Sequence, residues 1–381
     1  MTITFVTNLV HHHQLPVADE FYKMPGVEYH YIACEPMPDW LIKGGYDPTL
    51  ERPYIIRTYE GEKQLELAKK LIDESDVVII GSAPNDWVYN RKKENKVTFH
   101  YHERWLKHFS IKLLWPNAIY YRLKHFTQFR NKRTYMLCAS AFTSKDVKWY
   151  GAFPHKCFKW GYFTKVDEQF EVEAPKLGAS TSESTPLMWC ARFLRLKHPE
   201  LPVQLAAMLK KEGYKFHLDM FGSGEELDRI KALITELDVE ECVSLRGNLP
   251  NEEILKEMRK HSIFLFTSDR NEGWGAVLNE AMSNGCAVVA SNKIGSVPFL
   301  IKNEVNGLIF KSCDVGDLEH KVESLLNDRN KCQGIRKKAV ETMQTVWSPK
   351  NAANAFVNLA NHSLSNNLKS YTITEGPASW A

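Results

Sequence analysis

Glu272 and Glu280 are the residues of this sequence whose type and spacing could most directly do chemistry, with seven residues between them in NEGWGAVLNEAM. Paired carboxylates can act as acid and base, and a glycoside hydrolase holds such a pair about 5 to 9.5 Å apart across one bond. The run SIFLFTS predicts a strand, DRNEGWG predicts a loop, and AVLNEAMS predicts a helix that stops at Asn284 and Gly285. A helix N-terminus therefore separates the carboxylates, which favours ligand binding over hydrolysis.

The segment between the two glutamates suits one elongated ligand. A helix start presents free N–H groups and a positive dipole end that favour phosphate, and Gly275, next to Ala276, allows close approach. Glu280 would accept hydrogen bonds from a ribose, and Glu272 would accept them from a second sugar. That order of parts predicts a nucleotide-diphosphate sugar. From spacing alone, two solvated surface glutamates are an equally good interpretation.

The elements that must position these residues alternate regularly between strands and helices. Runs such as DVVIIGS and CAVVAS predict strands buried on both faces, with helices such as GEKQLELAKKLIDES between them. This alternation predicts an α/β fold with doubly wound parallel sheets. A polar stretch interrupts it once, so we expect Rossmann-like domains at 1–165 and 186–347, joined by a linker at 166–185 and facing across a cleft. We expect a polar and partly disordered tail at 365–381.

Cysteine usage and hydropathy exclude several classes of protein. The eight cysteines form no C-x-x-C pair and several lie in apolar runs, which predicts reduced core thiols in a cytoplasmic protein. The beginning of the sequence, MTITFVTNLV, predicts a strand rather than a signal peptide. No run of about 18 apolar residues occurs, so no membrane span is expected.

The stretch NEGWGAVLNEAMSNGCAVVAS resembles the E-x7-E motif of the retaining GT-B glycosyltransferases, in particular glycosyltransferase family 4, the glycosyl transferases group 1. Trp274 stands where that family usually has Phe, and Ser296 where a second Gly is common. LMWCARFLRLKHPELPVQLAAML resembles the family's strand, Arg, Lys and helix pattern. The resemblance assigns Arg192 and Lys197 to the donor diphosphate and implies the GT-B fold.

Further motifs of the C-terminal half match the family in the same order. LDMFGSGEEL resembles its Gly-x-Gly turn, and VWSPKNAANAF resembles its final helix, here 348–364, which packs back on the first domain. VSLRGNLPNEEILKEM resembles the segment that lines the nucleobase pocket. That pocket is expected at Gly247, Asn248, Leu249 and Pro250.

The N-terminal half resembles the family more loosely. FHYHERW resembles an H-x-H-E type stretch in which a histidine reaches the donor sugar, a role that we assign to His102, with His100 as the rival. TNLVHHHQLPVADEF replaces the family's glycine-rich loop and contains no glycine. Adjacent histidines rarely point at one ion, so a metal site there is disfavoured. The residues expected to line the cleft on the acceptor side are His11, His12, His13 and Gln14.

The expected mechanism needs no metal and no other cofactor, because no D-x-D motif occurs in the chain. Arg192 would fork onto phosphate oxygens and Lys197 would act as a point charge on the leaving diphosphate. The resemblance implies that the anomeric configuration is retained without a clear protein nucleophile. Glu272 and His102 would then position the donor.

Residues 91–133 are basic and aromatic. They hold 12 Lys/Arg and two Glu, a local charge of +10 that leaves −7 for the rest of a chain whose net charge is +3. One interpretation is peripheral docking on an anionic membrane, where each Lys/Arg contributes about 1 kcal/mol and Trp and Tyr suit the interface. A solvated helix face is the alternative. Nucleic-acid binding is disfavoured, because no nucleic-acid module appears and the acidic remainder would repel a polyanion.

These observations predict a hexosyltransferase that uses a nucleotide-diphosphate sugar, UDP- rather than GDP-linked, and a hydroxyl of a glycan or lipid-linked glycan acceptor. The resemblance implies bacterial capsule, exopolysaccharide, or lipopolysaccharide O-antigen assembly, in the cytoplasm or at the inner face of the cell membrane. Two alternatives stay open: a nucleotide-sugar 2-epimerase of GT-B fold, and a non-catalytic sugar-nucleotide-binding protein. The sequence specifies neither the linkage nor the oligomeric state.

Overall fold

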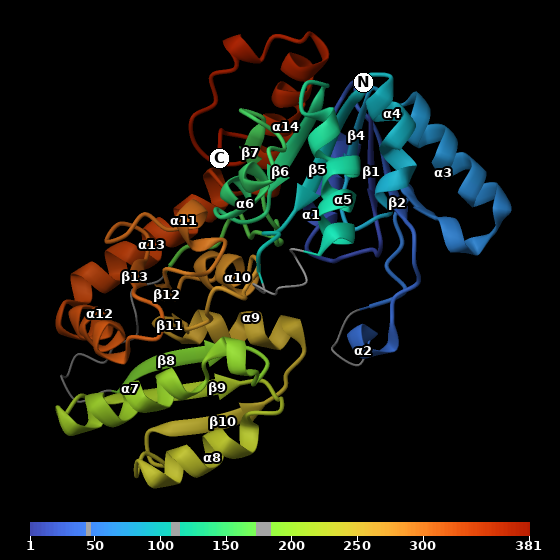
Figure 1. Ribbon diagram of the computed structural model, residues 1–381. Coiled ribbons are helices and arrows are strands. Elements are labelled where there is room, and N and C mark those ends of the chain that lie inside the picture. Colours follow the sequence, from blue (N-terminus) through green and yellow to red (C-terminus); the bar gives the residue numbers. More distant parts are fainter. Residues whose placement is uncertain (43–46, 108–114, 173–183) are drawn as a thin grey trace. The chain divides into compact units, whose positions relative to one another are not determined.

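The computed structural model describes residues 1–42, 47–107, 115–172 and 184–381 and divides the chain into two compact units (Figure 1). Unit 1 comprises Met1–Lys165 with Val346–Ala381, and unit 2 comprises Val166–Thr345. Each unit is built on one parallel sheet. The alternation of strands and helices in the sequence thus produces the two Rossmann-like α/β units that it predicts.

The sheet of unit 1 has the order β3-β2-β1-β4-β5-β6-β7. Its strands are β1 (Thr2–Thr7), β2 (Glu28–Ala33), β3 (Ile55–Arg57), β4 (Val77–Ile80), β5 (Val97–His102), β6 (Thr134–Cys138) and β7 (Cys157–Lys159). The strand order reverses at β1, which pairs with both β2 and β4. A crevice at the carboxyl ends of strands is expected at such a point. The sequence analysis missed β3 and β7, because three-residue edge strands show no periodicity.

The helices of unit 1 are α1 (Leu15–Lys23), α2 (Asp39–Ile42), α3 (Glu62–Glu74), α4 (Tyr89–Lys93), α5 (Pro116–His125), α6 (Thr143–Trp149) and α14 (Pro349–Leu364). The last of these belongs to unit 1 although unit 2 precedes it in the chain. Its buried Phe356 packs edge-on against Phe21 of α1, with ring centroids 5.6 Å apart. Aromatic burial therefore holds α14 on the sheet of unit 1.

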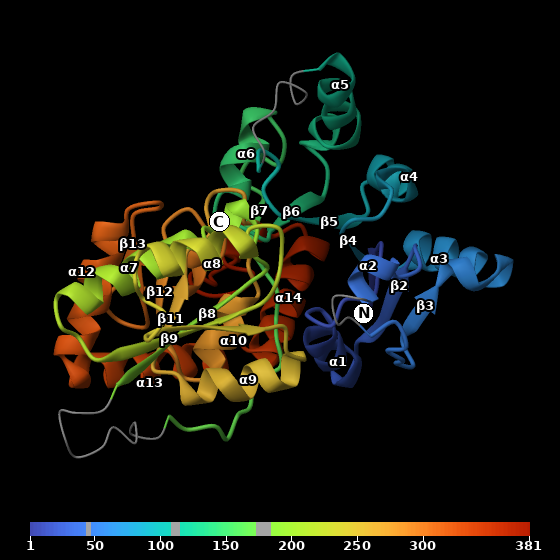
Figure 2. The ribbon, with the colours of Figure 1, turned by 90° about the horizontal axis from the view of Figure 1, so that it is seen from below.

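The sheet of unit 2 has the order β10-β9-β8-β11-β12-β13. Its strands are β8 (Thr185–Cys190), β9 (Phe216–Phe221), β10 (Val243–Gly247), β11 (Ile263–Phe266), β12 (Ala287–Ser291) and β13 (Leu308–Phe310). Its helices are α7 (Glu200–Lys211), α8 (Leu227–Glu236), α9 (Asn251–Lys260), α10 (Val277–Ser283), α11 (Val297–Leu300), α12 (Val315–Asn327) and α13 (Arg329–Thr345). Figure 2 shows α7 and α8 on one face of this sheet and α9, α10 and α13 on the other. The sheet is therefore covered on both faces, as a doubly wound fold requires.

The segment expected to be a linker, 166–185, lies partly outside the described residues, at 173–183. Its described beginning packs on unit 2. Gln344 of α13 donates hydrogen bonds to the carbonyls of Asp167 and Phe170, both at 2.9 Å. Val172 is buried as well. This part of the segment belongs to unit 2.

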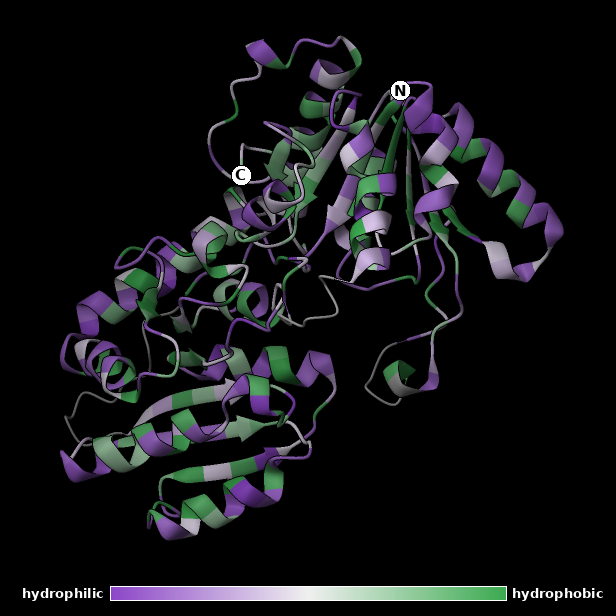
Figure 3. Cartoon of the chain, viewed as in Figure 1, coloured by the Kyte–Doolittle hydropathy of each residue, from purple (hydrophilic) through white to green (hydrophobic). Residues whose placement is uncertain are grey.

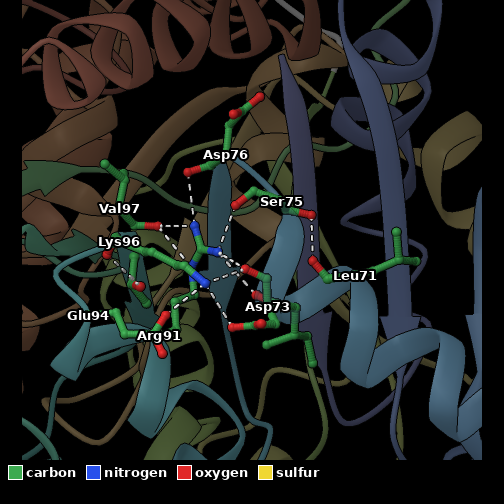
Figure 4. A network of polar contacts seen from close by, with 10 residues as sticks. Leu71, Asp73, Ser75, Asp76, Arg91, Glu94, Lys96 and Val97 are labelled. Atoms are coloured by element: carbon green, nitrogen blue, oxygen red, sulfur yellow. Dashed lines mark hydrogen bonds and ion pairs between the residues drawn. The ribbon is translucent and has the colours of Figure 1, made fainter.

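Arg91, the first cation of the basic stretch, is a structural residue. It is 1% exposed, and its guanidinium donates hydrogen bonds to backbone carbonyls at the end of α3, just after α3 and at the start of β5 (Figure 4). Those carbonyls at the end of α3 have no partner within the helix. The neighbouring Lys92 is fully buried and donates to the carbonyl of His125 at 2.6 Å. The interpretation of 91–133 as one solvated face is therefore wrong for these residues, and part of the stretch, 108–114, lies outside the described residues.

The expectation of a disordered tail is wrong. Residues Ala378–Ala381 pair with β7, since the Ala378 N–H donates to the Lys159 carbonyl and the Lys159 N–H donates to the Ser379 carbonyl, both at 2.7 Å. Trp380 packs on Phe158 with ring centroids 4.5 Å apart. Two aromatic side chains in this otherwise polar segment, Tyr371 and Trp380, supply the apolar surface that anchors it.

The interior agrees with the hydropathy of the sequence, except at one cysteine. Figure 3 shows hydrophobic residues concentrated in the strands and hydrophilic residues along the outer faces of the helices. The eight cysteines are free, and four of them are buried, but Cys313 is exposed, which corrects its expected core position. Among the described residues, no helix is long and apolar enough to cross a membrane.

Candidate functional site

Two loops at the carboxyl edge of the unit 2 sheet carry the residues predicted to bind diphosphate and sugar. The loop after β8 holds Arg192 and Lys197, and the loop between β11 and α10 holds Glu272. These loops are close because β8 and β11 are neighbouring parallel strands. The ammonium of Lys197 forms an ion pair with the carboxylate of Glu272, and the two side chains are 14% and 12% exposed. The structure thus brings together two predicted site residues that are distant in the sequence.

Hydrogen bonds fix these loops to each other and to the sheet. The hydroxyl of Thr267 donates to the carbonyl of Lys197 at 2.7 Å and accepts from the indole of Trp189 at 2.9 Å. The N–H of Asp269 donates to the carbonyl of Leu196 at 3.0 Å. The Lys197–Glu272 pair therefore rests on a backbone held by buried partners.

Sequence analysis missed three residues beside this pair. The imidazole of His198 lies 2.7 Å from a carboxylate oxygen of Glu200 and 3.5 Å from one of Asp269. The hydrogen bond to Glu200 raises the pKa of His198, against an opposing effect of burial. The signal in the sequence was LKHPE, which places a histidine next to the expected phosphate lysine and an acid two positions later.

Arg192 is exposed, and within the described residues its guanidinium has no hydrogen-bond or ion-pair partner. The Gly-x-Gly turn after β9 packs on the backbone of the same loop. A Cβ atom at Gly222 would overlap the carbonyl of Ala191, and one at Gly224 would overlap the backbone of Phe193. Both glycines also have positive φ. The predicted turn therefore needs glycine for packing as well as for conformation, and it supports the segment that presents Arg192.

Gly275 has a φ of +80°, and a Cβ atom there would overlap the ring of Phe266. The start of α10 follows at once, with Ala276 as its N-cap and Glu280 within the helix, as predicted. Trp274 is fully buried, and its carbonyl accepts a hydrogen bond from Ser296 at 2.6 Å. The hydroxyl of Ser296 thus ties down the loop at the position where a glycine is common in the resembled family.

Glu280 is nearly buried, at 9% exposed, and accepts a hydrogen bond from the side-chain amide of Asn251 at 3.0 Å. Burial raises the pKa of Glu280 to about 7, although the hydrogen bond from Asn251 opposes the shift. Glu272 is also mostly covered. The alternative of two solvated surface glutamates is therefore wrong.

The predicted nucleobase segment connects β10 to α9. Gly247 has a φ of +71°, and its carbonyl accepts from the N–H of Gly222 at 2.8 Å. The amide of Asn248 donates to the hydroxyl of Ser223 at 2.7 Å. Leu249 is 40% exposed, and Pro250 caps α9, where Asn251 reaches Glu280. The segment is thus linked to the Gly-x-Gly turn at one end and to Glu280 at the other.

Unit 1 contains a cavity of about 400 Å³ at the carboxyl ends of β1, β4, β5 and β6. It is lined by four of the predicted residues, His11, His13, Gln14 and His102. His12 does not line it and instead packs on His13, with ring centroids 3.8 Å apart. His100 faces the core and is fully buried. Within the described residues neither ring nitrogen of His100 has a hydrogen-bond partner.

The histidines of this cavity are neutral at physiological pH. Burial lowers the pKa of His11 to about 4 and that of His13 to about 3, with the neighbouring histidines adding to each shift. Burial, with the charges of Arg122 and Lys92, lowers the pKa of His102 to about 4. The cavity therefore presents hydrogen-bonding groups with little positive charge from imidazoles.

The rest of the cavity wall is polar and aromatic. The amide of Gln14 donates to the hydroxyl of Tyr101 at 2.7 Å, and the hydroxyl of Tyr162 donates to Glu103 at 2.9 Å. The ring of His13 stacks on Tyr162 with an interplanar angle of 9°. Paired carboxylate, hydroxyl and amide groups beside a ring suit a sugar.

A second cavity, of about 690 Å³, lies between α6 and the start of β7 and contains none of the predicted site residues. Size alone therefore does not select the site. Among the described residues, no cluster of three or more His, Cys, Asp or Glu side chains could hold a metal ion.

Residues 178–342 match the family model described as Glycosyl transferases group 1. Among curated relatives, the poly(glycerol-phosphate) alpha-glucosyltransferase of Bacillus subtilis is 27% identical over 168 residues, 44% of this chain and 24% of that protein. The amylovoran biosynthesis glycosyltransferase AmsK of Erwinia amylovora is 31% identical over 137 residues, 35% of this chain and 33% of that protein. The matched region thus spans a third or less of these relatives.

The structure resembles solved proteins over nearly the whole chain. Anabaena HepE in complex with UDP superposes with a TM-score of 0.65 at 14% identity and covers 97% of this chain and 100% of that chain. The lipopolysaccharide outer core galactosyltransferase WaaB gives a TM-score of 0.66 at 17% identity, with 97% and 100% coverage. At such identities the likeness establishes the fold, which is GT-B.

Proposed function

We propose that this protein is a glycosyltransferase that moves a sugar from a nucleotide-diphosphate sugar, UDP- rather than GDP-linked, to a hydroxyl of a glycan or lipid-linked glycan. The observation that carries the proposal is the Lys197–Glu272 pair. Lys197 shares its loop with Arg192, whose exposed guanidinium has no hydrogen-bond or ion-pair partner among the described residues. A ligand with adjacent phosphate and sugar hydroxyls matches those charges. UDP is supported by solved structures of similar fold, HepE with UDP and pneumococcal GtfA with UDP and GlcNAc.

In this proposal the donor lies along unit 2 in the order base, ribose, diphosphate, sugar. The segment Gly247–Pro250 contacts the base, and Glu280 accepts from the ribose hydroxyls. The diphosphate contacts Arg192, Lys197 and the backbone N–H groups at Gly275 and Ala276. In the free protein Lys197 is neutralised by Glu272. Donor phosphate competes for that ammonium and releases the carboxylate to accept from the sugar.

The chemical step breaks the bond between the anomeric carbon and the phosphate oxygen. The diphosphate departs with the electron pair, and the acceptor oxygen forms the new bond and passes its proton to an oxygen of the departing diphosphate. Arg192 and Lys197 stabilise the charge that develops on the leaving group without needing a metal ion. Retention of the anomeric configuration is supported by the resemblance to the retaining family, and Glu272 then positions the donor.

The acceptor is proposed to bind in the cavity of unit 1. The neutral His11 and His13, with Gln14, offer hydrogen bonds to sugar hydroxyls, and the stacked ring of Tyr162 offers an apolar face. His102 is the proposed contact to the donor sugar, supported by its position in the cavity wall. His100 is unsuited to that role because it is fully buried.

A pathway in bacterial capsule, exopolysaccharide or lipopolysaccharide assembly is supported by the names of the similar proteins. AmsK is an amylovoran biosynthesis enzyme, and WaaB is a lipopolysaccharide outer core galactosyltransferase. The proposed location is the cytoplasm, with peripheral contact at the inner face of the cell membrane.

Peripheral membrane contact is proposed for part of 91–133. Its exposed aromatics gather at α5, where Trp115 is 55% and Tyr120 is 66% exposed. Flotation with anionic liposomes tests this contact. Tyr120→Ser should reduce flotation, whereas Tyr22→Ser, at a 50% exposed tyrosine of α1, should not. Absence of flotation would remove the membrane contact from the proposal, and equal flotation with neutral and anionic liposomes would remove the role of the basic residues in it.

A panel of UDP-, GDP- and ADP-sugars with glycan acceptors tests the activity. Release of nucleotide with a glycosylated product supports the transferase. An altered donor sugar with no release indicates the 2-epimerase instead, and saturable binding without conversion indicates a sugar-nucleotide-binding protein. The anomeric configuration of the product, read by NMR, decides between retention and inversion.

A further inference from the structure

His198 follows Lys197 directly and has an uncommon backbone conformation. Its φ of +48° lies in the left-handed region. Residues with side chains rarely adopt this conformation unless their surroundings hold them there, and such positions cluster at functional sites. The surroundings of His198 should therefore show what holds it.

Both ring nitrogens of His198 face carboxylates. Nδ1 lies 2.7 Å from Glu200, at the start of α7, and Nε2 lies 3.5 Å from Asp269, in the loop after β11. A third group, the thiol of Cys313 after β13, lies 3.6 Å from Nε2. An imidazole can donate from both nitrogens only when it is protonated. The geometry therefore describes an imidazolium held between two acids.

The other charges near this cluster are already paired. Arg229 of α8 donates to the second oxygen of Glu200 at 3.0 Å and also pairs with Glu226. Lys197 pairs with Glu272. The carboxylates of Glu200 and Asp269 are thus the main groups that stabilise a positive charge on His198, in agreement with its raised pKa.

Asp269 connects this imidazolium to Glu272. The carbonyl of Asp269 accepts from the N–H of Glu272 at 3.1 Å, and its N–H donates to the carbonyl of Leu196 at 3.0 Å. Its side chain accepts from the N–H of Asn271 at 2.7 Å. Any shift of Asp269 would therefore move Glu272 on one side and the segment before Lys197 on the other.

We infer that His198 is a positioning residue: as an imidazolium it couples the loop of Lys197 to the loop of Glu272, so that both charges meet the diphosphate and the sugar of the donor. The inference rests on the proposed transferase function. Its consequence is a pH dependence. Above the pKa of His198 one nitrogen stops donating, the contact to one carboxylate is lost, and transfer slows.

The test compares His198→Asn with the wild-type enzyme. Asparagine tolerates the left-handed conformation but carries no charge. We expect kcat to fall roughly tenfold to a hundredfold, as misplacement near a reacting centre does, with a smaller change in the donor KM. The wild-type enzyme should lose kcat as pH rises above the pKa of His198. This decline should be absent in His198→Asn, and the thermal midpoint should change little.

His217→Asn is the matched control. His217 also faces a carboxylate, that of Asp219 at 3.3 Å, but it lies within β9 and its other partner is Ser244 of β10. Its activity and pH profile should match those of the wild-type enzyme. Asp269→Asn is the second variant, and it serves if His198→Asn unfolds. In the double variant, the loss of kcat caused by Asp269→Asn should not add to the loss caused by His198→Asn, because both substitutions remove the same contact.

Wild-type kcat and an unchanged alkaline limb in His198→Asn would overturn the positioning role and leave the transferase function standing. Fully additive losses in the double variant would also overturn it. A wild-type protein that binds no nucleotide sugar by calorimetry and releases no nucleotide would overturn the proposed function, and the inference with it.

Discussion

The loops of unit 2 present an ion pair, whereas the histidines that line the cavity of unit 1 are neutral. In unit 2, Lys197 and Glu272 form an ion pair, and the hydrogen bond to Glu200 raises the pKa of His198. In unit 1, burial keeps His11 and His102 neutral. Charged groups suit an anionic leaving group, and neutral donors and acceptors suit hydroxyls. The comparison supports a donor on unit 2 and an uncharged part of the acceptor on unit 1.

The backbones differ in the same sense. The loop of Glu272 contains Gly275 at a φ of +80°, where packing against Phe266 leaves no room for a side chain. The loop TNLVHHHQLP of unit 1 contains no glycine and is held through side chains such as Gln14, which bonds to Tyr101. The loop of Glu272 therefore depends on close backbone packing, whereas the histidine loop of unit 1 depends on side-chain partners.

The largest expected effect is on the charged pair. Lys197→Ala and Glu272→Ala should each lower kcat/KM about 10²- to 10³-fold, because each removes a group that stabilises or orients the reacting donor. Thermal unfolding should show folded variants, and Lys211→Ala, at the end of α7, should be unaffected. Turnover at the wild-type level in either site variant would show that the charged pair of unit 2 does not act on the donor.

Glu280 should reveal a cost of burial within unit 2. Its folded pKa of about 7 lies above the ordinary value of 4.5, so its contribution to stability is fully present below pH 4.5 and is lost as pH rises towards 7. Glu280→Gln should therefore be more stable than wild type at pH 8, by up to about 3 kcal/mol, and much less so at pH 5. Denaturant unfolding at both pH values measures this difference.

The same variant should alter donor binding. A ribose hydroxyl donates better to the carboxylate than to the neutral acid. Wild-type affinity for UDP, measured by calorimetry, should rise through about pH 7, while that of Glu280→Gln should stay flat. Parallel pH profiles for the two proteins would show that Glu280 does not contact the ribose.

Gly275→Ala tests the close packing of the charged loop. Positive φ and overlap with Phe266 act together there. Gly213→Ala is the matched control, because Gly213 also has a φ of +80° but has no atom within 4 Å of a built Cβ. The control should lose about 1 kcal/mol, and Gly275→Ala about 2 kcal/mol more. Equal losses in unfolding free energy would mean that the loop can yield.

The smallest expected effect belongs to unit 1. His102→Ala should reduce kcat about tenfold, since the proposed neutral hydrogen bond to the sugar is lost. It should leave UDP binding unchanged, because the proposal places the base and the phosphates on unit 2. His100→Ala should instead act through folding, because His100 is fully buried in the core. A large loss of UDP affinity in folded His102→Ala would contradict the separation of roles.

The basic stretch shows why charge counts along a sequence mislead. Arg91 and Lys92 carry two of its charges, yet both are buried and bind backbone carbonyls. Nothing in RKKENK distinguishes them from the exposed Lys93 that follows. Their roles depend on carbonyls left open at the end of α3 for Arg91 and at the end of α5 for Lys92, which only the folded chain brings near.

The pairing of the tail and the edge strands could not be predicted from the sequence for a related reason. Pairing of Ala378–Ala381 with β7 joins segments that are more than 200 residues apart, and β7 itself has three residues. Neither piece has enough local periodicity to predict a strand. Trp380 is the residue of the tail that could have indicated burial from the sequence. Its partner, Phe158, is identified only in the folded structure.

The sequence by itself determined the α/β alternation, the two units, and the placement of Glu272 in a loop and Glu280 in the helix after it, because periodicity and glycine are local signals. The family resemblance added Arg192 and Lys197. Only the tertiary structure decided that Lys197 meets Glu272, that Glu280 is buried with a raised pKa, and that His198 lies between two acids. Those properties depend on neighbouring parallel strands and on exclusion of water, and both arise from contacts between residues distant in the chain.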